Sequence, residues 1–404
     1  MTSRSLGHRA PLLWLVLPFM AGLALGKMGE FAPVAGWLGA ALIAALAAVW
    51  TSGRAARWWA PTLSLAMFFA GNASYALQRA RLSAWDALPP REATLALRID
   101  RVFAQKNPQR ASGLARVVSA DAHLRELVGQ RIYFSLALKK GEAAPVRSAV
   151  VLAVGILETL PRDPAADSFD GYLAGAGMNF RLQRGRVVAE ERAATAYYRF
   201  CAQAAVTFND ILGWGIAAKR PALAGLLRAM MLGETHELSQ EQHALFMQSG
   251  TMHLFAISGL NIGVIAGALH ALLLLLRLPL WVRYVVGVAL LWLFVDITGG
   301  SPSAVRSFVM AAFLQAAFVV RRPANPLAAL VASALVVLLV APLQMFSASF
   351  LMSYAIVAAL LILGLPLSEA VLDRWNPWRD LPQVTWSWWQ RAISGAWHAT
   401  ATAL

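Results

Sequence analysis

The chain has 404 residues, of which 58 % are hydrophobic and only 14 % are charged, and its mean hydropathy is +0.56. This apolar content exceeds what the cores of soluble domains need, which excludes a water-soluble enzyme. The net charge of +14 fits contact with nucleic acid or anionic lipid headgroups. The single cysteine, Cys201, permits no intramolecular disulfide and no cysteine-built metal cluster.

Residues 1–90 contain apolar runs that predict about three transmembrane helices, at 12–26, 34–50 and 59–77. The first run is short enough to be a signal peptide. Two more apolar runs follow it closely, so we expect three retained spans.

Residues 91–192 change to short alternating stretches rich in β-branched and aromatic residues, at 93–102, 113–119, 131–138, 146–157 and 178–188. This pattern predicts strands, and five of them in so short a stretch favour a small closed or nearly closed barrel of the OB type among other all-β folds.

Basic residues with aromatic neighbours run along the same stretch, and OB barrels hold single strands on such surfaces. The candidate DNA-binding residues are Arg98, Arg101, Lys106, Arg131, Tyr133, Phe134, Lys139 and Lys140. Acidic residues are interspersed, and the aromatic side chains suit a barrel core equally well, so a purely structural role is the alternative.

Residues 193–245 predict an amphipathic helical connector that lies on the membrane surface. Residues 246–404 then predict about five further spans, at 246–276, 284–298, 304–320, 327–341 and 346–365. The expected fold class is a polytopic α-helical membrane protein with an inserted small all-β, OB-like domain.

Basic residues in the short loops predict the orientation. Arg4 and Arg9 place the N-terminus in the cytoplasm, and the third span then leaves the β domain outside. The later loops expected on the cytoplasmic side carry Arg277 and Arg283, Arg321 and Arg322, and Arg374 and Arg379.

The segment 246–276 is too long for one straight span, and its first half is rich in small and polar residues. The candidate lining residues of a polar passage in this half are Thr251, His253, Ser258, Gly259, Asn261 and Gly263. Such residues fit either a broken helix that lines a water-filled passage or a tightly packed helix–helix seam.

A second candidate lies at the turn Thr298, Gly299, Gly300, Ser301, Pro302, Ser303, which leads into Arg306 at the start of a span. A charge there is costly against lipid, so Arg306 is expected to face protein, water or an anion. The alternative is that its side chain extends toward the headgroups.

Enzyme motifs are mostly missing. Gln240 stands where a helical zinc-protease motif needs its second histidine, and Ser258 lies outside a nucleophile elbow. A serine–histidine hydrolase pair of Ser258 with His253 or His270 is the remaining enzymatic alternative. We therefore expect no enzyme, no cofactor and no metal.

The run from Phe246 to Gly263, FMQSGTMHLFAISGLNIG, closely resembles the signature of the ComEC-type DNA-internalisation competence proteins. The resemblance extends from about Arg91 to Leu365 and includes the turn before Arg306 and the Phe169–Leu173 stretch. It implies passage of one DNA strand across the cytoplasmic membrane. Asn261 departs from the family, which commonly has histidine at that position.

Full-length family members typically continue into a metallo-β-lactamase-like domain, and this chain contains no such metal-binding run. The resemblance therefore implies a bacterial inner-membrane, multi-pass channel component rather than a nuclease. The partners expected are single-stranded DNA, membrane lipids and other DNA-uptake proteins, with oligomer formation left open. The alternative function is a small-molecule or lipid transporter that uses the same broken helix.

Overall fold

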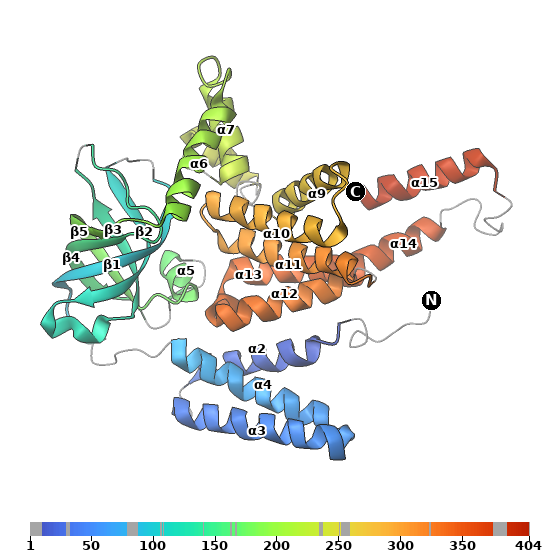
Figure 1. Ribbon diagram of the computed structural model, residues 1–404, viewed down its shortest axis with the longest axis horizontal. Coiled ribbons are helices and arrows are strands. Elements are labelled where there is room, and N and C mark those ends of the chain that lie inside the picture. Colours follow the sequence, from blue (N-terminus) through green and yellow to red (C-terminus); the bar gives the residue numbers. More distant parts are fainter. Residues whose placement is uncertain are drawn as a thin grey trace.

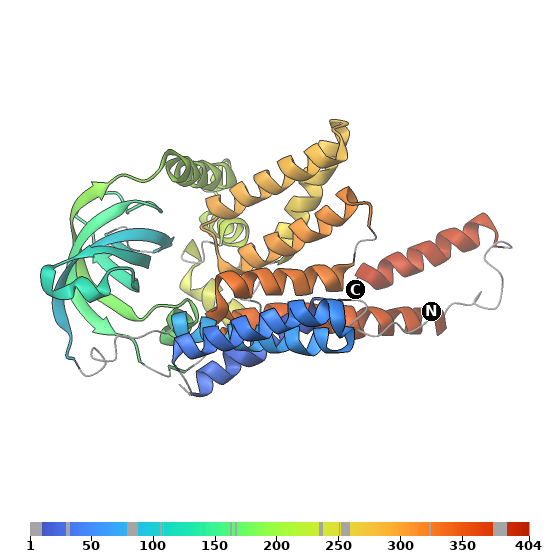
Figure 2. The same cartoon turned by 60° about the horizontal axis from the view of Figure 1, so that its bottom comes forward.

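The computed structural model describes residues 10–29, 33–78, 88–105, 107, 109–139, 141–161, 164–165, 168–233, 237–249, 251, 259–322, 325–374 and 386–403. Figure 1 shows a β-barrel at one end and a group of helices that extends away from it, with the N-terminal helices packed along that group. The turned view in Figure 2 keeps this arrangement. The barrel therefore lies beyond one end of the helix bundle.

The N-terminal helices are α2 (Leu13–Met28), α3 (Val34–Arg54) and α4 (Ala56–Gln78). α4 packs against both of the others. Its close crossing with α2 requires glycine at two positions. A Cβ on Gly22 would strike the carbonyl of Phe68, and one on Gly71 would strike the carbonyl of Phe19. Small residues permit this kind of contact between transmembrane helices.

The barrel strands are β1 (Arg91–Phe103), β2 (Arg110–Ala120), β3 (Arg131–Ala137), β4 (Val150–Thr159) and β5 (Phe180–Arg192). They close in the order β1-β2-β3-β5-β4, with β3 and β5 parallel and the other pairs antiparallel. The closed barrel of five strands confirms the predicted small all-β domain.

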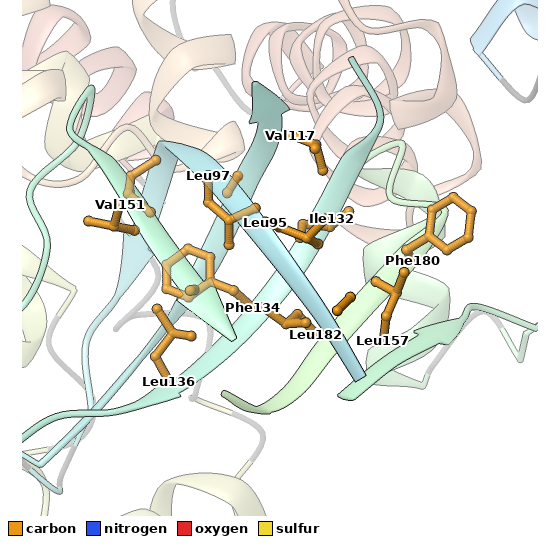
Figure 3. Packing of buried hydrophobic residues seen from close by; sticks show 14 of the residues in the cluster. Leu95, Leu97, Val117, Ile132, Phe134, Leu136, Val151, Leu157, Phe180 and Leu182 are labelled. Carbon is orange, nitrogen blue, oxygen red and sulfur yellow. The ribbon is translucent and has the colours of Figure 1, made fainter. Parts of the chain in front are cut away.

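Alternation of side chains along the strands builds the barrel core. Leu95, Leu97, Phe134 and Leu182 point into it and are buried (Figure 3). Between β2 and β3 lies the 3₁₀ helix η2 (Ala122–Leu127). The short helix α5 (Phe169–Gly175) precedes β5 and lies between the barrel and the helix bundle (Figure 1).

Two helices replace the single amphipathic segment expected after the barrel, namely α6 (Ala196–Gly213) and α7 (Pro221–Leu232). α7 ends at Gly233, whose left-handed conformation is a common way to terminate a helix. α8 (Gln240–Gln248) begins with a capping box at Ser239, and α9 (Gly259–Leu275) follows. Most residues between α8 and α9 lie outside the described residues, so the predicted break in the segment 246–276 stays a prediction.

The remaining helices are α10 (Leu280–Ile297), α11 (Pro302–Val319), α12 (Pro326–Val340), the 3₁₀ helix η5 (Pro342–Phe346), α13 (Ala348–Ala359), the π-helical η6 (Leu360–Gly364), α14 (Leu365–Arg374) and α15 (Trp388–Ala403). Pro279, Pro302 and Pro326 stand at helix starts, where a missing N–H costs nothing.

Four of the described helices are long and apolar enough to cross a membrane: Val34–Arg54, Leu280–Ile297, Pro302–Val319 and Ala348–Ser368. The predicted spans at 12–26 and 327–341, and the second half of 246–276, coincide with the shorter apolar helices Leu13–Met28, Pro326–Val340 and Asn261–Leu275.

The N-terminal helices are attached to the bundle through α2. Phe19 and Leu23 of α2 share a buried cluster with Leu330 and Leu338 of α12. The Lys27 ammonium lies 5.0 Å from the ring centroid of Phe346 at the end of η5. Since η5 also contacts α4 and α5, this short helix joins the N-terminal helices, the bundle and the barrel.

Candidate functional site

A cavity of about 550 Å³ lies between the barrel and the barrel-facing ends of the helices. The barrel contributes Arg101, Leu114, Arg131 and the α5 residues Tyr172 and Gly175. The helices contribute three groups: Gln78, Leu232 and Gly233; Thr298 and Gly300 to Ser303; and Ala341, Leu343, Gln344, Ser347 and Ser349. The cavity therefore joins the two regions in which the sequence predicted DNA contacts.

Arg101 and Arg131 provide the positive charge on the barrel side of the cavity. Arg101 Nη1 donates to the Tyr172 hydroxyl at 3.2 Å, and its guanidinium lies 5.3 Å from the ring centroid of Phe103. Burial lowers the pKa of Arg101, and burial followed by repulsion from Arg116 lowers the pKa of Arg131. Both guanidinium groups remain cationic at neutral pH because the ordinary pKa of arginine is far above it.

The aromatic side chains around Arg101 form a connected group on β1, β3 and α5. Phe103 stacks on Tyr133 at 6.4 Å between centroids, and Phe169 contacts both Tyr133 and Tyr172. Phe169 is 52 % exposed, so part of this group is open to solvent. Exposed rings beside guanidinium groups are the elements on which single-stranded bases stack.

The turn between α10 and α11 forms the opposite wall. Gly299 and Gly300 have φ values of +83° and +60°, a region that residues with a Cβ rarely adopt. The Ser301 hydroxyl accepts from the Ala304 N–H at 3.2 Å and starts α11. Of the predicted residues here, Thr298 and Ser303 line the cavity, whereas Gly299 does not.

Arg306 lies on α11 with only 3 % of its surface exposed. Its Nη2 donates to the Ser349 hydroxyl at 2.7 Å and to the Ser349 carbonyl at 3.0 Å, and Nη1 donates to Gln344 Oε1 at 3.4 Å. Gln344 and Ser349 line the cavity, but Arg306 does not. Arg306 thus faces protein, as predicted, but it supports the cavity wall instead of forming it.

An ion pair that sequence reasoning missed holds the barrel on the bundle. Arg147, in the loop between β3 and β4, donates to Asp296 Oδ1 at 2.7 Å, and the Tyr197 hydroxyl of α6 donates to Asp296 Oδ2 at 2.8 Å. The Asp296 side chain is 1 % exposed. Burial and the bond to Asp296 raise the pKa of Tyr197, which keeps the phenol protonated as a donor.

The predicted polar segment is only partly described. Asn261 Nδ2 donates to the Met230 carbonyl at 3.0 Å and so joins α9 to α7, and the hydroxyls of Ser249 and Thr251 lie 2.7 Å apart. A Cβ on Gly259 would come within 3.2 Å of Ser307 Oγ, whereas one on Gly263 would meet nothing within 4 Å. His253 and Ser258 lie outside the described residues.

The barrel residues proposed for DNA contact divide by the face of the sheet on which they lie. Phe134 is 0 % exposed in the barrel core, so its prediction as a stacking residue is wrong; alternation along β3 instead turns Tyr133 outward. Arg98 and Lys139 are exposed. Lys106 and Lys140 lie outside the described residues.

The described residues hold no group of three or more His, Cys, Asp or Glu side chains placed to bind a metal ion. Cys201 is a free, buried thiol on α6. The polar groups that line the cavity are arginines, hydroxyls and amides, and they lie beside apolar residues such as Leu114, Leu232 and Leu343.

Comparison with known proteins gives a family match for the C-terminal part of the chain. Residues 230–401, from the end of α7 onward, match the family model described as Competence protein. Among curated proteins, ComE operon protein 3 of Bacillus subtilis (strain 168) is 28 % identical over 142 residues, which is 35 % of this chain and 18 % of that protein's length. No solved structure matches the chain. The signature at Phe246–Gly263 lies inside the matched region, so the C-terminal part of the chain is similar to competence proteins.

Proposed function

We propose that the chain is a component of a bacterial DNA-uptake channel in the cytoplasmic membrane. In this proposal the barrel receives single-stranded DNA, and the strand passes through the cavity to the helix bundle. The observation that carries the proposal is that one cavity is lined both by Arg101 and Arg131 of the barrel and by Thr298 and Ser303 of the bundle. The competence family match supports DNA as the cargo.

The chemistry of the cavity fits a phosphodiester backbone. Guanidinium groups donate to phosphate oxygens, and hydroxyl and amide groups supply further contacts without reading the base sequence. Ser303, Gln344 and Ser347 provide such groups opposite the two arginines. A strand of any sequence could therefore be bound, as DNA uptake requires.

The arrangement of the helices supports an extracytoplasmic barrel. Basic residues gather at the helix ends opposite those that line the cavity, namely Arg54 and Arg57, Arg277 and Arg283, and Arg321 and Arg322. Helices of 18 residues span about 27 Å at 1.5 Å per residue, close to the thickness of the hydrocarbon core. Basic loops favour the cytoplasm, so the barrel would lie on the outer side.

A transporter of small molecules or lipids is the alternative, and it would use the same cavity. Its volume could hold such a ligand. No observation on the site favours this alternative over DNA, whereas the family match favours DNA.

Complementation tests the proposal. The chain, alone and as a replacement for the matching region of a full-length relative, is expressed in a naturally competent strain that lacks its own relative, and internalised labelled DNA is measured. We expect uptake to be restored, and to fall at least tenfold when Arg101 and Arg131 are both changed to Gln. Restored uptake that this double variant leaves unchanged would remove the cavity from the path.

A further inference from the structure

Three arginines stand directly opposite one another across neighbouring strands of the barrel. Arg98 of β1 is paired in register with Arg116 of β2, and Arg116 is paired with Arg131 of β3. Their chain neighbours Leu97, Val117 and Ile132 are buried in the core, so the three arginines share the outer face. We call this set the arginine row.

Such an arrangement is unfavourable in the isolated chain. Like charges at directly opposed positions on a sheet destabilise it. Asp100, which projects at the bulge between Ile99 and Arg101, is the carboxylate that faces the row, at 3.9 Å from Arg98 Nη2. Within the described part of the chain, no salt bridge engages Arg116 or Arg131. Among the described residues, the row thus keeps an excess of positive charge over the single carboxylate of Asp100.

Individual donors in the row also lack partners. Among the described residues, the Nε of Arg116 is buried without a hydrogen-bond partner, and so is the Nε of Arg101 beside the row. A buried donor without a partner costs free energy, which a bound acceptor would recover. An unsatisfied buried donor needs an explanation, and an acceptor oxygen of a bound ligand is one.

The row leads from solvent into the cavity. Arg98 is exposed, Arg116 is half-buried, and Arg131 lines the cavity wall. Gly177, with a φ of +80°, follows α5 and leaves room for Arg131 Nη1, which would lie 3.6 Å from a Cβ there. Neighbouring strands are about 4.8 Å apart, so the row covers about 10 Å of the barrel surface.

We infer that the arginine row binds consecutive phosphates of a single DNA strand and directs the strand into the cavity. The inference rests on the proposed function and assigns a phosphate-binding role to Arg116, together with an order of contacts: Arg98 first, Arg116 next and Arg131 last. Nearby Tyr133 and Phe169 would stack on the bases of the same strand.

The test uses the full chain in nanodiscs of uncharged phosphatidylcholine, with a fluorescent 12-nucleotide oligothymidylate as the probe. The variant Arg116→Gln/Arg131→Gln is compared with Arg186→Gln/Arg192→Gln, which removes two exposed arginines from β5 of the same barrel. We expect the row variant to lose about tenfold in affinity and its logarithmic salt slope to fall by about 1.4, since each single-strand phosphate contact contributes about 0.7. The control variant should lose less than about twofold.

Thermal unfolding separates binding from structure. Without DNA, the row variant should be at least as stable as the unchanged chain, because the substitutions relieve repulsion between Arg116 and its neighbours. If the row variant does not fold, Arg116→Lys/Arg131→Lys replaces it; it should keep the salt slope and lose about threefold in affinity, because lysine is a point charge and not a planar fork.

Three results would overturn the inference. Equal losses in the row and β5 variants would mean that only total charge matters, and unchanged binding in both the row variant and the lysine pair would remove the row from the contact. In either case the unchanged chain still binds DNA and the proposed function stands. Failure of the unchanged chain to bind the probe at low salt would instead overturn both.

Discussion

Arg147→Gln should loosen the barrel from the bundle. The change removes the partner of Asp296 Oδ1 and leaves a carboxylate that is 1 % exposed with Tyr197 as its remaining donor. The ring of Tyr198, which lies 4.6 Å from the Arg147 guanidinium, loses its cation contact as well.

The size of the effect follows from the burial of the two partners. Exposed ion pairs contribute about 0.2–1 kcal/mol, whereas removal of one partner from a fully buried pair costs about 3–5 kcal/mol. The Asp296 side chain is fully buried but that of Arg147 is 36 % exposed, so an intermediate cost of about 2 kcal/mol is expected. At about 1.4 kcal/mol per factor of ten, the equilibrium for opening this contact should increase about thirtyfold.

The native thiol of Cys201 provides the assay. Cys201 is 3 % exposed and lies on α6 beside Tyr197, and burial raises the pKa of its thiol, so a maleimide reacts mainly when the contact opens. The labelling rate in nanodiscs should rise about thirtyfold in Arg147→Gln and remain unchanged in Arg199→Gln, an exposed arginine on the same helix.

The double variant Arg147→Gln/Asp296→Asn tests the cause. It leaves no unpaired buried charge, so its labelling rate should fall back at least partway toward that of the unchanged chain. An unchanged rate in Arg147→Gln, or a double variant that labels faster than Arg147→Gln, would refute the assigned role of this ion pair.

Other predictions concern topology, helix packing and the barrel core. In a cysteine-free background, a cysteine at position 139 should react with an impermeant maleimide from outside the cell, and a cysteine at position 322 should not. The opposite result would place the barrel in the cytoplasm. Gly259→Leu should lower membrane abundance because a Cβ at this position would crowd Ser307, whereas Gly263→Leu should accumulate normally because position 263 faces open space. Equal abundance of the two variants would contradict the packing described. Phe134→Ala should destabilise the barrel by about 3–5 kcal/mol, measured by thermal unfolding, and a loss below about 1 kcal/mol would exclude it from the core.

The barrel could be predicted from the sequence because its signals are local. Alternation of apolar and polar residues between turns located each strand to within a few residues, as with the expected 93–102 against β1 at Arg91–Phe103. The positions of the helices could be predicted in the same way, since the length of an apolar run and a proline at a helix start are properties of short segments. Phe134 was assigned wrongly because an aromatic residue next to basic residues looks the same in sequence whether it points inward or outward.

The cavity depends on contacts between distant parts of the chain, which no local pattern encodes. Arg147 and Asp296 are 149 residues apart, so their pairing follows only from the way the barrel docks. One signal was available: Asp296 is a lone acidic residue at the end of an apolar helix, where an ionisable group needs a partner. The arginine row likewise needs the strand register, which places Arg98, Arg116 and Arg131 side by side.

Crosslinking during uptake tests the proposed DNA path most directly. A photoreactive benzophenone is attached to a cysteine at Ser303, which lines the cavity, or at Phe318, which is exposed farther along the same helix α11. Illumination while labelled DNA is entering competent cells should attach DNA to the chain at position 303 and not at position 318. Crosslinking at position 318 alone, or at neither position while uptake proceeds, would contradict a path through the cavity.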